Sequence, residues 1–154
     1  MARIISIFLA ALLLAHFWAG PAAVADVFKK YEKVIYIDQL KQVGAAYENG
    51  KKIMEFPVLT GDDEKTTNPG VYIIGMKVQD YFSRKYQVPM PYSLFFDMRA
   101  RKAVHEGEVP PPEQRREVAT HGCVHVEQPH MEWLFEWAEV GKTRVVIYGW
   151  RSEE

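Results

Sequence analysis

Cysteine is almost absent from this sequence of 154 residues, where Cys123 is the only one. A chain with one cysteine cannot form a disulfide with itself. Three interpretations of Cys123 therefore remain: a small buried apolar residue, a link to another chain, or a reactive thiol. The surrounding residues have to decide among them.

An excess of charge of one sign is also lacking. The chain has 19 Lys and Arg against 20 Asp and Glu, for a formal net charge of −1 at pH 7. This balance provides no basic surface of the kind that nucleic acids require, so we expect no nucleic-acid partner. The sequence has neither internal repeats nor a low-complexity linker, and its length indicates one domain.

Long apolar runs are missing except at the N-terminus. There Arg3 precedes an apolar stretch over residues 4–15, and Ala23-Val24-Ala25 follows it. This pattern is typical of a secretory signal peptide that is cleaved before Asp26. The stretch is shorter than the roughly 20 residues of a membrane span. We expect a signal peptide over residues 1–25 and a mature exported domain over 26–154, in the periplasm or cell envelope and without a membrane span; the alternative is an uncleaved anchor.

The mature sequence predicts a mostly β protein. Asn49-Gly50 predicts a hairpin turn, Pro57 an edge strand or a bulge, and residues 81–91 an irregular segment. One helix is predicted over residues 129–140, ended by Gly141 as a left-handed cap. A long loop over residues 106–118 is expected to cover the functional site. Together these features favour a β-sandwich or flattened barrel with one packed helix near the C-terminus; strands are predicted at 33–38, 42–47, 52–59, 71–74, 92–96, 102–105 and 143–148.

Most of the histidines gather around the single cysteine. The motif Thr120-His121-Gly122-Cys123-Val124-His125 contains two of them, and His105 and His130 lie on either side. A neighbouring imidazole or clustered backbone N–H groups make a thiol nucleophilic. Gly122 permits a tight turn that aims such N–H groups at one point, as in an oxyanion hole. Zinc bound by Cys123 and three of these histidines (His105, His121 and His125) is an alternative, although a turn at Gly122 disfavours it.

His105, then fourteen residues, then Thr120-His121-Gly122-Cys123 resembles the signature of the L,D-transpeptidase (YkuD) family. The resemblance continues in Gly61, Asn68-Pro69-Gly70 and Met90-Pro91-Tyr92, and covers nearly all of residues 34–147. It implies a YkuD-like β-sandwich and a catalytic domain over residues 26–154. Two departures are Glu106, which stands between His105 and Gly107, and His125, where the family has Arg or Asn.

The resemblance also implies a reaction and its residues. Cys123 would attack a peptidoglycan stem peptide, release D-Ala and form a thioester, with no metal or organic cofactor. The acyl group would pass to the amine of a second stem, to a lysine of an envelope protein, or to water. His105 would be the base, with oxyanion donors at His121, Gly122 and Cys123. Thr120, Tyr92 and His125 would bind substrate.

Several alternatives stay open beside this interpretation. The first is an L,D-carboxypeptidase, and the second is a catalytically idle module that binds peptidoglycan. Three carboxylates of the 106–118 loop are candidates to receive an acceptor amine: Glu106, Glu108 and Glu117.

Overall fold

The computed structural model of the protein describes residues 21–115 and 117–151. Most of the predicted signal peptide lies outside these residues. Helix α1 (Pro21–Lys30) crosses the predicted cleavage position. Phe28 on this helix stacks on Tyr47 with ring centroids 4.0 Å apart. Cleavage before Asp26 stays a prediction.

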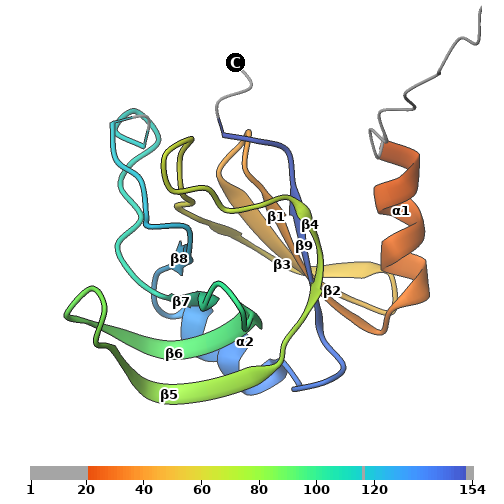
Figure 1. Ribbon diagram of the computed structural model, residues 1–154. Helices are drawn as coiled ribbons and strands as arrows, with labels where there is room; N and C mark the ends of the chain where they lie inside the picture. Colours follow the sequence, from red (N-terminus) through yellow and green to blue (C-terminus); the bar gives the residue numbers. More distant parts are fainter. Residues whose placement is uncertain (1–20, 116, 152–154) are drawn as a thin grey trace, which may run out of the picture.

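Two sheets form the body of the molecule (Figure 1). One has the strand order β3-β2-β1-β9-β4 and the other β5-β6-β7-β8. Pairing is antiparallel except for β1 with β9 and β7 with β8. The strands are β1 (Lys33–Asp38), β2 (Val43–Glu48), β3 (Lys51–Pro57), β4 (Gly70–Ile73), β5 (Met76–Ser83), β6 (Val88–Asp97), β7 (Lys102–Glu106), β8 (Val124–Val126) and β9 (Arg144–Tyr148).

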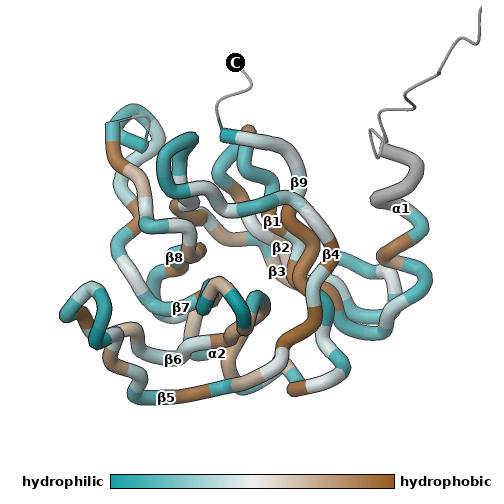
Figure 2. Tube along the Cα trace, in the orientation of Figure 1, coloured by the Kyte–Doolittle hydropathy of each residue, from teal (hydrophilic) through white to brown (hydrophobic). Residues whose placement is uncertain are grey.

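The main core lies between the sheets and helix α2 (His130–Trp137). It combines Ile35 of β1, Leu94 of β6 and Val104 of β7 with Met131 and Leu134 of the helix, all fully buried. Figure 2 shows the apolar segments concentrated along the central strands and the polar segments in the peripheral loops. The predicted mostly β fold with one packed helix near the C-terminus is confirmed.

The first hairpin also follows the sequence. Asn49 and Gly50 have φ values of 50° and 78°, as a type I′ turn requires. Pro57 ends β3, which is an edge strand of its sheet. Proline tolerates this position because an edge strand does not need every backbone N–H.

The irregular segment expected at residues 81–91 is wrong. Most of it belongs to a hairpin, in which β5 pairs with β6 from Met76↔Phe95 to Ser83↔Val88. Pro89 and Pro91 concealed the strand, because proline usually argues against a paired strand. Both precede the part of β6 that pairs with β7, so they interrupt no ladder on that side.

The predicted helix is too long at its C-terminal end. It stops at Trp137, and Ala138 is extended with φ −73° and ψ 142°. The chain turns here because the amide of Glu139 donates to Thr143 Oγ1 at 2.9 Å, which leads into β9. Gly141 is left-handed with φ 77°, as expected, but it belongs to this turn and not to a helix cap.

Candidate active site

The predicted base lies on β7, and the predicted nucleophile immediately precedes the neighbouring strand β8. They pair in parallel with the register Val104↔Val124 and His105↔His125. Cys123 immediately precedes β8 and packs beside Ala103, two residues before His105 on β7. Residues two apart on a strand point to the same face, so His105 and Ala103 share the face on which the thiol lies.

The hydroxyl of Thr120 fixes the turn that carries the thiol. Its Oγ1 accepts a hydrogen bond from the Gly122 amide at 3.1 Å and donates to the Cys123 carbonyl. Thr120 is 4 % exposed. These contacts make it a part of the turn, and its predicted role in substrate binding stays a prediction.

Gly122 is needed for both its conformation and its lack of a side chain. Its φ is 100°, a region that favours glycine. A Cβ at this position would lie 2.8 Å from the carbonyl oxygen of Thr66. The carbonyl of Gly122 accepts a hydrogen bond from Thr67 Oγ1 at 3.0 Å, and this bond holds the turn from behind.

The turn exposes backbone donors of the expected kind. The Gly122 amide is engaged by Thr120. Among the described residues, the amides of His121 and Cys123 have no hydrogen-bond acceptor. These two N–H groups are therefore available to a developing oxyanion.

The ring of His105 is oriented for use as a base. It is 5 % exposed, and its Nδ1 lies 2.7 Å from the carbonyl oxygen of Glu106. A carbonyl oxygen can only accept, so Nδ1 carries the proton and Nε2 is left with its lone pair. Burial and the neighbouring His125 lower the pKa of His105 to about 4, which keeps the imidazole neutral near pH 7.

His125 lies beside His105 and is held from two sides. Its Nδ1 lies 3.2 Å from the carbonyl oxygen of Glu108. A Cβ on Gly107 would approach its ring Cγ to 2.6 Å, so the glycine at 107 makes room for the ring. Burial lowers the pKa of His125 too. His125, which stands where the family has Arg or Asn, is thus a part of the surroundings of His105.

The surroundings of Cys123 do not lower the pKa of its thiol. Burial raises the pKa of Cys123, and the Ala103 amide and the Lys102 charge oppose that rise. The low pKa of His105 also disfavours a resting thiolate–imidazolium pair. The arrangement fits a neutral thiol that loses its proton to a neutral imidazole during attack.

Two residues near the site were not predicted from the sequence. Tyr86, in the turn between β5 and β6, lies against His121 with ring centroids 4.6 Å apart. Lys102 lies beside Gly122, with its Nζ 3.5 Å from the position of a Cβ there. Neither belongs to the Cys123 motif, and only the pairing of distant strands brings them to it.

Tyr92 of β6 packs in a different apolar cluster from Cys123. It packs against the main core, with its ring 5.5 Å from that of Phe135, and its hydroxyl donates to Glu132 Oε1 at 3.4 Å. Cys123 packs in a separate small cluster with Met90 and Phe95. The role of Tyr92 as a substrate wall stays a prediction.

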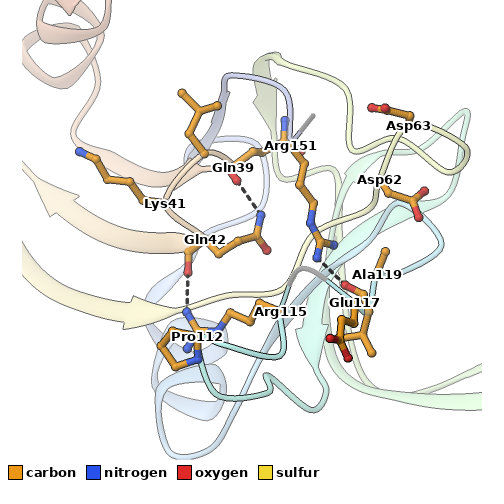
Figure 3. A pocket seen from close by; sticks show the side chains of 12 residues that line it. Gln39, Lys41, Gln42, Asp62, Asp63, Pro112, Arg115, Glu117, Ala119 and Arg151 are labelled. Carbon is orange, nitrogen blue, oxygen red and sulfur yellow. Dashed lines mark hydrogen bonds between the residues drawn. The ribbon is translucent and has the colours of Figure 1, made fainter. Parts of the chain in front are cut away.

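The 106–118 loop covers the site only at its base. Gly107 and Glu108 contact His125, whereas Arg115 farther along donates to the carbonyl of Gln42 at 3.3 Å. The distal half instead borders a cavity of about 500 Å³ (Figure 3). None of the seven predicted site residues is in its lining, which consists of Gln39, Leu40, Lys41, Gln42, Asp62, Asp63, Pro112, Arg115, Glu117, Val118, Ala119 and Arg151.

The three carboxylates expected near an acceptor are separated. Glu117 borders the larger cavity. Glu106 and Glu108 border a second hollow of about 450 Å³, together with Glu127. Two of the three are therefore on the side of His125.

Two further observations limit other kinds of site. Among residues 21–115 and 117–151, no three His, Cys, Asp or Glu side chains gather as a possible metal-ion site. The four residues of the zinc alternative form no such group there. Over the same ranges, no helix has the length and apolar character needed to cross a membrane.

Comparison with known proteins identifies the family. The model of the YkuD family, described as the L,D-transpeptidase catalytic domain, matches residues 32–147. The chain belongs to this family. A search of curated proteins found no match.

Solved L,D-transpeptidases have the same fold. The enzyme from Stackebrandtia nassauensis is 26 % identical with a TM-score of 0.71, and the match covers 81 % of this chain and 59 % of that one. The enzyme from Xylanimonas cellulosilytica is 28 % identical with a TM-score of 0.64, covering 84 % and 70 %. L,D-transpeptidase 3 from Mycobacterium tuberculosis, in complex with a faropenem-derived adduct, is 14 % identical with a TM-score of 0.65, covering 77 % and 60 %. The match thus spans less than two thirds of the first and third of these chains.

Proposed function

We propose that this chain is an exported L,D-transpeptidase that acts on peptidoglycan stem peptides through a thioester on Cys123. The single observation that carries the proposal is the pairing of β7 with β8 in a YkuD domain. This pairing supports the proposal because His105 lies on β7 and Cys123, the only cysteine of the sequence, immediately precedes β8.

The first half of the reaction transfers the acyl group to sulfur. His105 Nε2 takes the thiol proton as Cys123 Sγ attacks the carbonyl carbon at the L-centre of the stem's third residue. The amides of His121 and Cys123 donate to the oxyanion of the tetrahedral intermediate. The C–N bond to D-Ala then breaks, His105 returns the proton to the leaving amine, and a thioester remains.

The second half regenerates the thiol. An acceptor amine attacks the thioester carbon, His105 takes a proton from the nitrogen, and the C–S bond breaks. The sulfur recovers its proton from His105, and a new amide is released. Water in place of the amine gives a free carboxylate, which is the L,D-carboxypeptidase outcome. The acceptor is a second stem or a lysine of an envelope protein.

The idle-module alternative predicts binding without chemistry. Retention of Cys123, His105 and the Thr120 hydrogen bonds favours an enzyme, because a binding module would need none of them together. The experiment is release of D-Ala from a purified tetrapeptide muropeptide, with and without an amine acceptor. We expect release by the wild type and loss with Cys123→Ala and His105→Ala, each with unchanged circular dichroism. Wild-type binding without release would establish the idle module.

Faropenem provides an independent probe of the same thiol, since a similar structure was solved with an adduct derived from it. We expect a mass increase on Cys123 by peptide mapping, and none in Cys123→Ala. Release of D-Ala by both the wild type and the Cys123→Ala variant would disprove the thioester mechanism.

Export is tested separately. Intact mass of the protein recovered from the cell envelope should correspond to residues 26–154. A species that retains the first 25 residues would favour the uncleaved anchor.

A further inference from the structure

Lys102 begins β7, three residues before His105, and its side chain is engaged outside its own sheet. Its Nζ donates to the carbonyl oxygen of Thr66 and, at 2.6 Å, to Asn68 Oδ1. Both acceptors belong to the segment between β3 and β4. The lysine therefore connects the strand of the base to a loop far away in the sequence.

That loop segment holds the nucleophile's turn from behind. Thr67 Oγ1 donates to the carbonyl of Gly122 at 3.0 Å and accepts from the Gly61 amide at 2.9 Å. The ammonium group binds the residues on both sides of Thr67. A Cβ on Gly122 would lie 3.1 Å from Lys102 Cε and 3.5 Å from Nζ, so the lysine lies against the turn itself.

We propose that Lys102 is a positioning residue, and that it acts on the Cys123 turn in two ways. It holds the Thr66–Asn68 segment against Gly122, and it keeps a positive charge beside the group that becomes negative during the reaction. The catalytic half of this inference rests on the proposed function. The effect on the thiol does not, because it exists without substrate.

A fixed cation is useful here because the thiol is buried. Burial raises the pKa of Cys123, and the charge of Lys102 opposes that rise. Negative charge develops first on the sulfur and then on the carbonyl oxygen, and a charge already in place stabilises both without reorganisation. An ammonium has three N–H donors, and two of them fix Lys102 in place.

Other titratable groups also lie around the thiol. They are His105 of β7, His121 in the turn, His125 of β8 and Tyr81 of β5, which packs in the same small cluster. His105 and His125 have pKa values lowered by burial. Among the described residues, no carboxylate lies within ion-pair distance of Lys102.

The experiment measures the rate of alkylation of Cys123 by iodoacetamide, a neutral electrophile, from pH 6 to pH 10. Lys102→Met removes the charge and keeps most of the alkyl chain. We expect its alkylation profile to move to higher pH, and a rise of 1 in the thiol pKa lowers the rate at neutral pH about tenfold. Lys102→Arg should restore most of the wild-type profile. Lys77→Met is the matched control, since Lys77 also donates to a backbone carbonyl, that of Ala138 at 2.7 Å.

Asn68→Ala separates the two roles, because it removes one hydrogen bond of the ammonium and leaves the charge. It should lower D-Ala release while moving the alkylation profile less than Lys102→Met does. If Lys102→Met does not fold, as judged by circular dichroism, Lys102→Gln replaces it.

A wild-type profile in the neutral variant would overturn the charge role, and unchanged D-Ala release in Asn68→Ala would overturn the positioning role. If the wild type releases no D-Ala, the proposed function fails, yet the alkylation profiles still test Lys102.

Discussion

The rings of His105 and His125 meet edge to face, with their centroids 4.7 Å apart and an angle of 65° between their planes. The parallel register of β7 and β8 imposes this contact, because it places the two residues directly side by side. Two imidazolium ions so close would repel each other. The contact therefore helps to keep the base unprotonated, and it links the unusual His125 to the chemistry of His105.

This contact predicts how the reaction responds to acid. Protonation inactivates a base, and His105 has a pKa of about 4 because of burial and the neighbouring His125. Replacement of His125 by asparagine removes the second of these causes. The acid limb of the pH profile of D-Ala release in His125→Asn should then lie at higher pH than in the wild type. The measurement is kcat/KM between pH 4 and pH 8.

His130→Asn is the control for that experiment. His130 also lies near an aromatic ring, that of Phe56 at 6.1 Å, but on the helix at the main core. The acid limb of the pH profile of His130→Asn should coincide with that of the wild type. An unchanged limb in His125→Asn would mean that burial alone sets the pKa of His105.

The glycines at 122 and 141 offer a matched pair. Both have positive φ, of 100° and 77°, so alanine at either position costs about 1–2 kcal/mol of conformational strain. A Cβ at 141 meets nothing within 4 Å, whereas at 122 it lies 2.8 Å from Thr66 O. Gly122→Ala should abolish D-Ala release, because the turn must move to relieve that contact. Gly141→Ala should lower the free energy of unfolding but keep the activity of the folded protein.

Urea unfolding and D-Ala release on the same preparations make this comparison. Near-normal release by a folded Gly122→Ala protein would show that the turn tolerates displacement. The positions of the His121 and Cys123 amides would then be unimportant for catalysis.

Thr120 predicts a loss of activity that exceeds the loss of stability. Thr120→Val leaves the Gly122 amide without its acceptor and removes the donor to the Cys123 carbonyl. Removing one partner of a buried hydrogen bond costs about 1–3 kcal/mol. We expect a destabilisation of that size and a fall in D-Ala release of at least tenfold. Thr120→Ser should retain both bonds and most of the activity.

Thr143→Val is the corresponding control. Thr143 is fully buried, and its Oγ1 accepts from the Glu139 amide at 2.9 Å, in the turn between α2 and β9. This variant should lose comparable stability without loss of activity per folded molecule. Equal loss of activity in the two valine variants would make Thr120 a structural residue only.

Local chemistry made much of the fold predictable. Asn49-Gly50 specified a turn, and β-branched runs specified β1 and β9, because these signals depend on neighbouring residues alone. The β5–β6 hairpin and the end of α2 depend on partners far away in the sequence. Pro89 is tolerated because the part of β6 that contains it does not pair with β7. Ala138 is extended because the next residue, Glu139, donates its amide to Thr143 Oγ1. Such tertiary effects leave no local pattern to read.

The site divides in the same way. Cys123, His105 and Gly122 could be named because a thiol, an imidazole and a flexible turn declare their chemistry by residue type. The raised pKa of Cys123 could not be foreseen, since it follows from burial against β6 and β7. Lys102 and Tyr86 were missed because lysine and tyrosine are common at surfaces, and only the pairing of distant strands brings them to the turn.

Burial of a neutral His105 also predicts how stability depends on pH. The pKa of His105 falls from 6.5 in the unfolded chain to about 4 in the folded chain. Between pH 4 and pH 6.5 the unfolded chain therefore binds this proton more tightly than the folded chain does. Stability is then fully present above pH 6.5 and is lost as the pH falls toward 4. Since a tenfold change in proton affinity corresponds to about 1.4 kcal/mol, this histidine accounts for about 3 kcal/mol of the loss between pH 7.5 and pH 4. His105→Asn removes the titrating group, so its free energy of unfolding should fall less over that range by about this amount. Urea unfolding at pH 7.5, 5.5 and 4 measures the difference. Parallel curves for His105→Asn and the wild type would mean that His105 is solvated when folded and is not the buried neutral base that the mechanism requires.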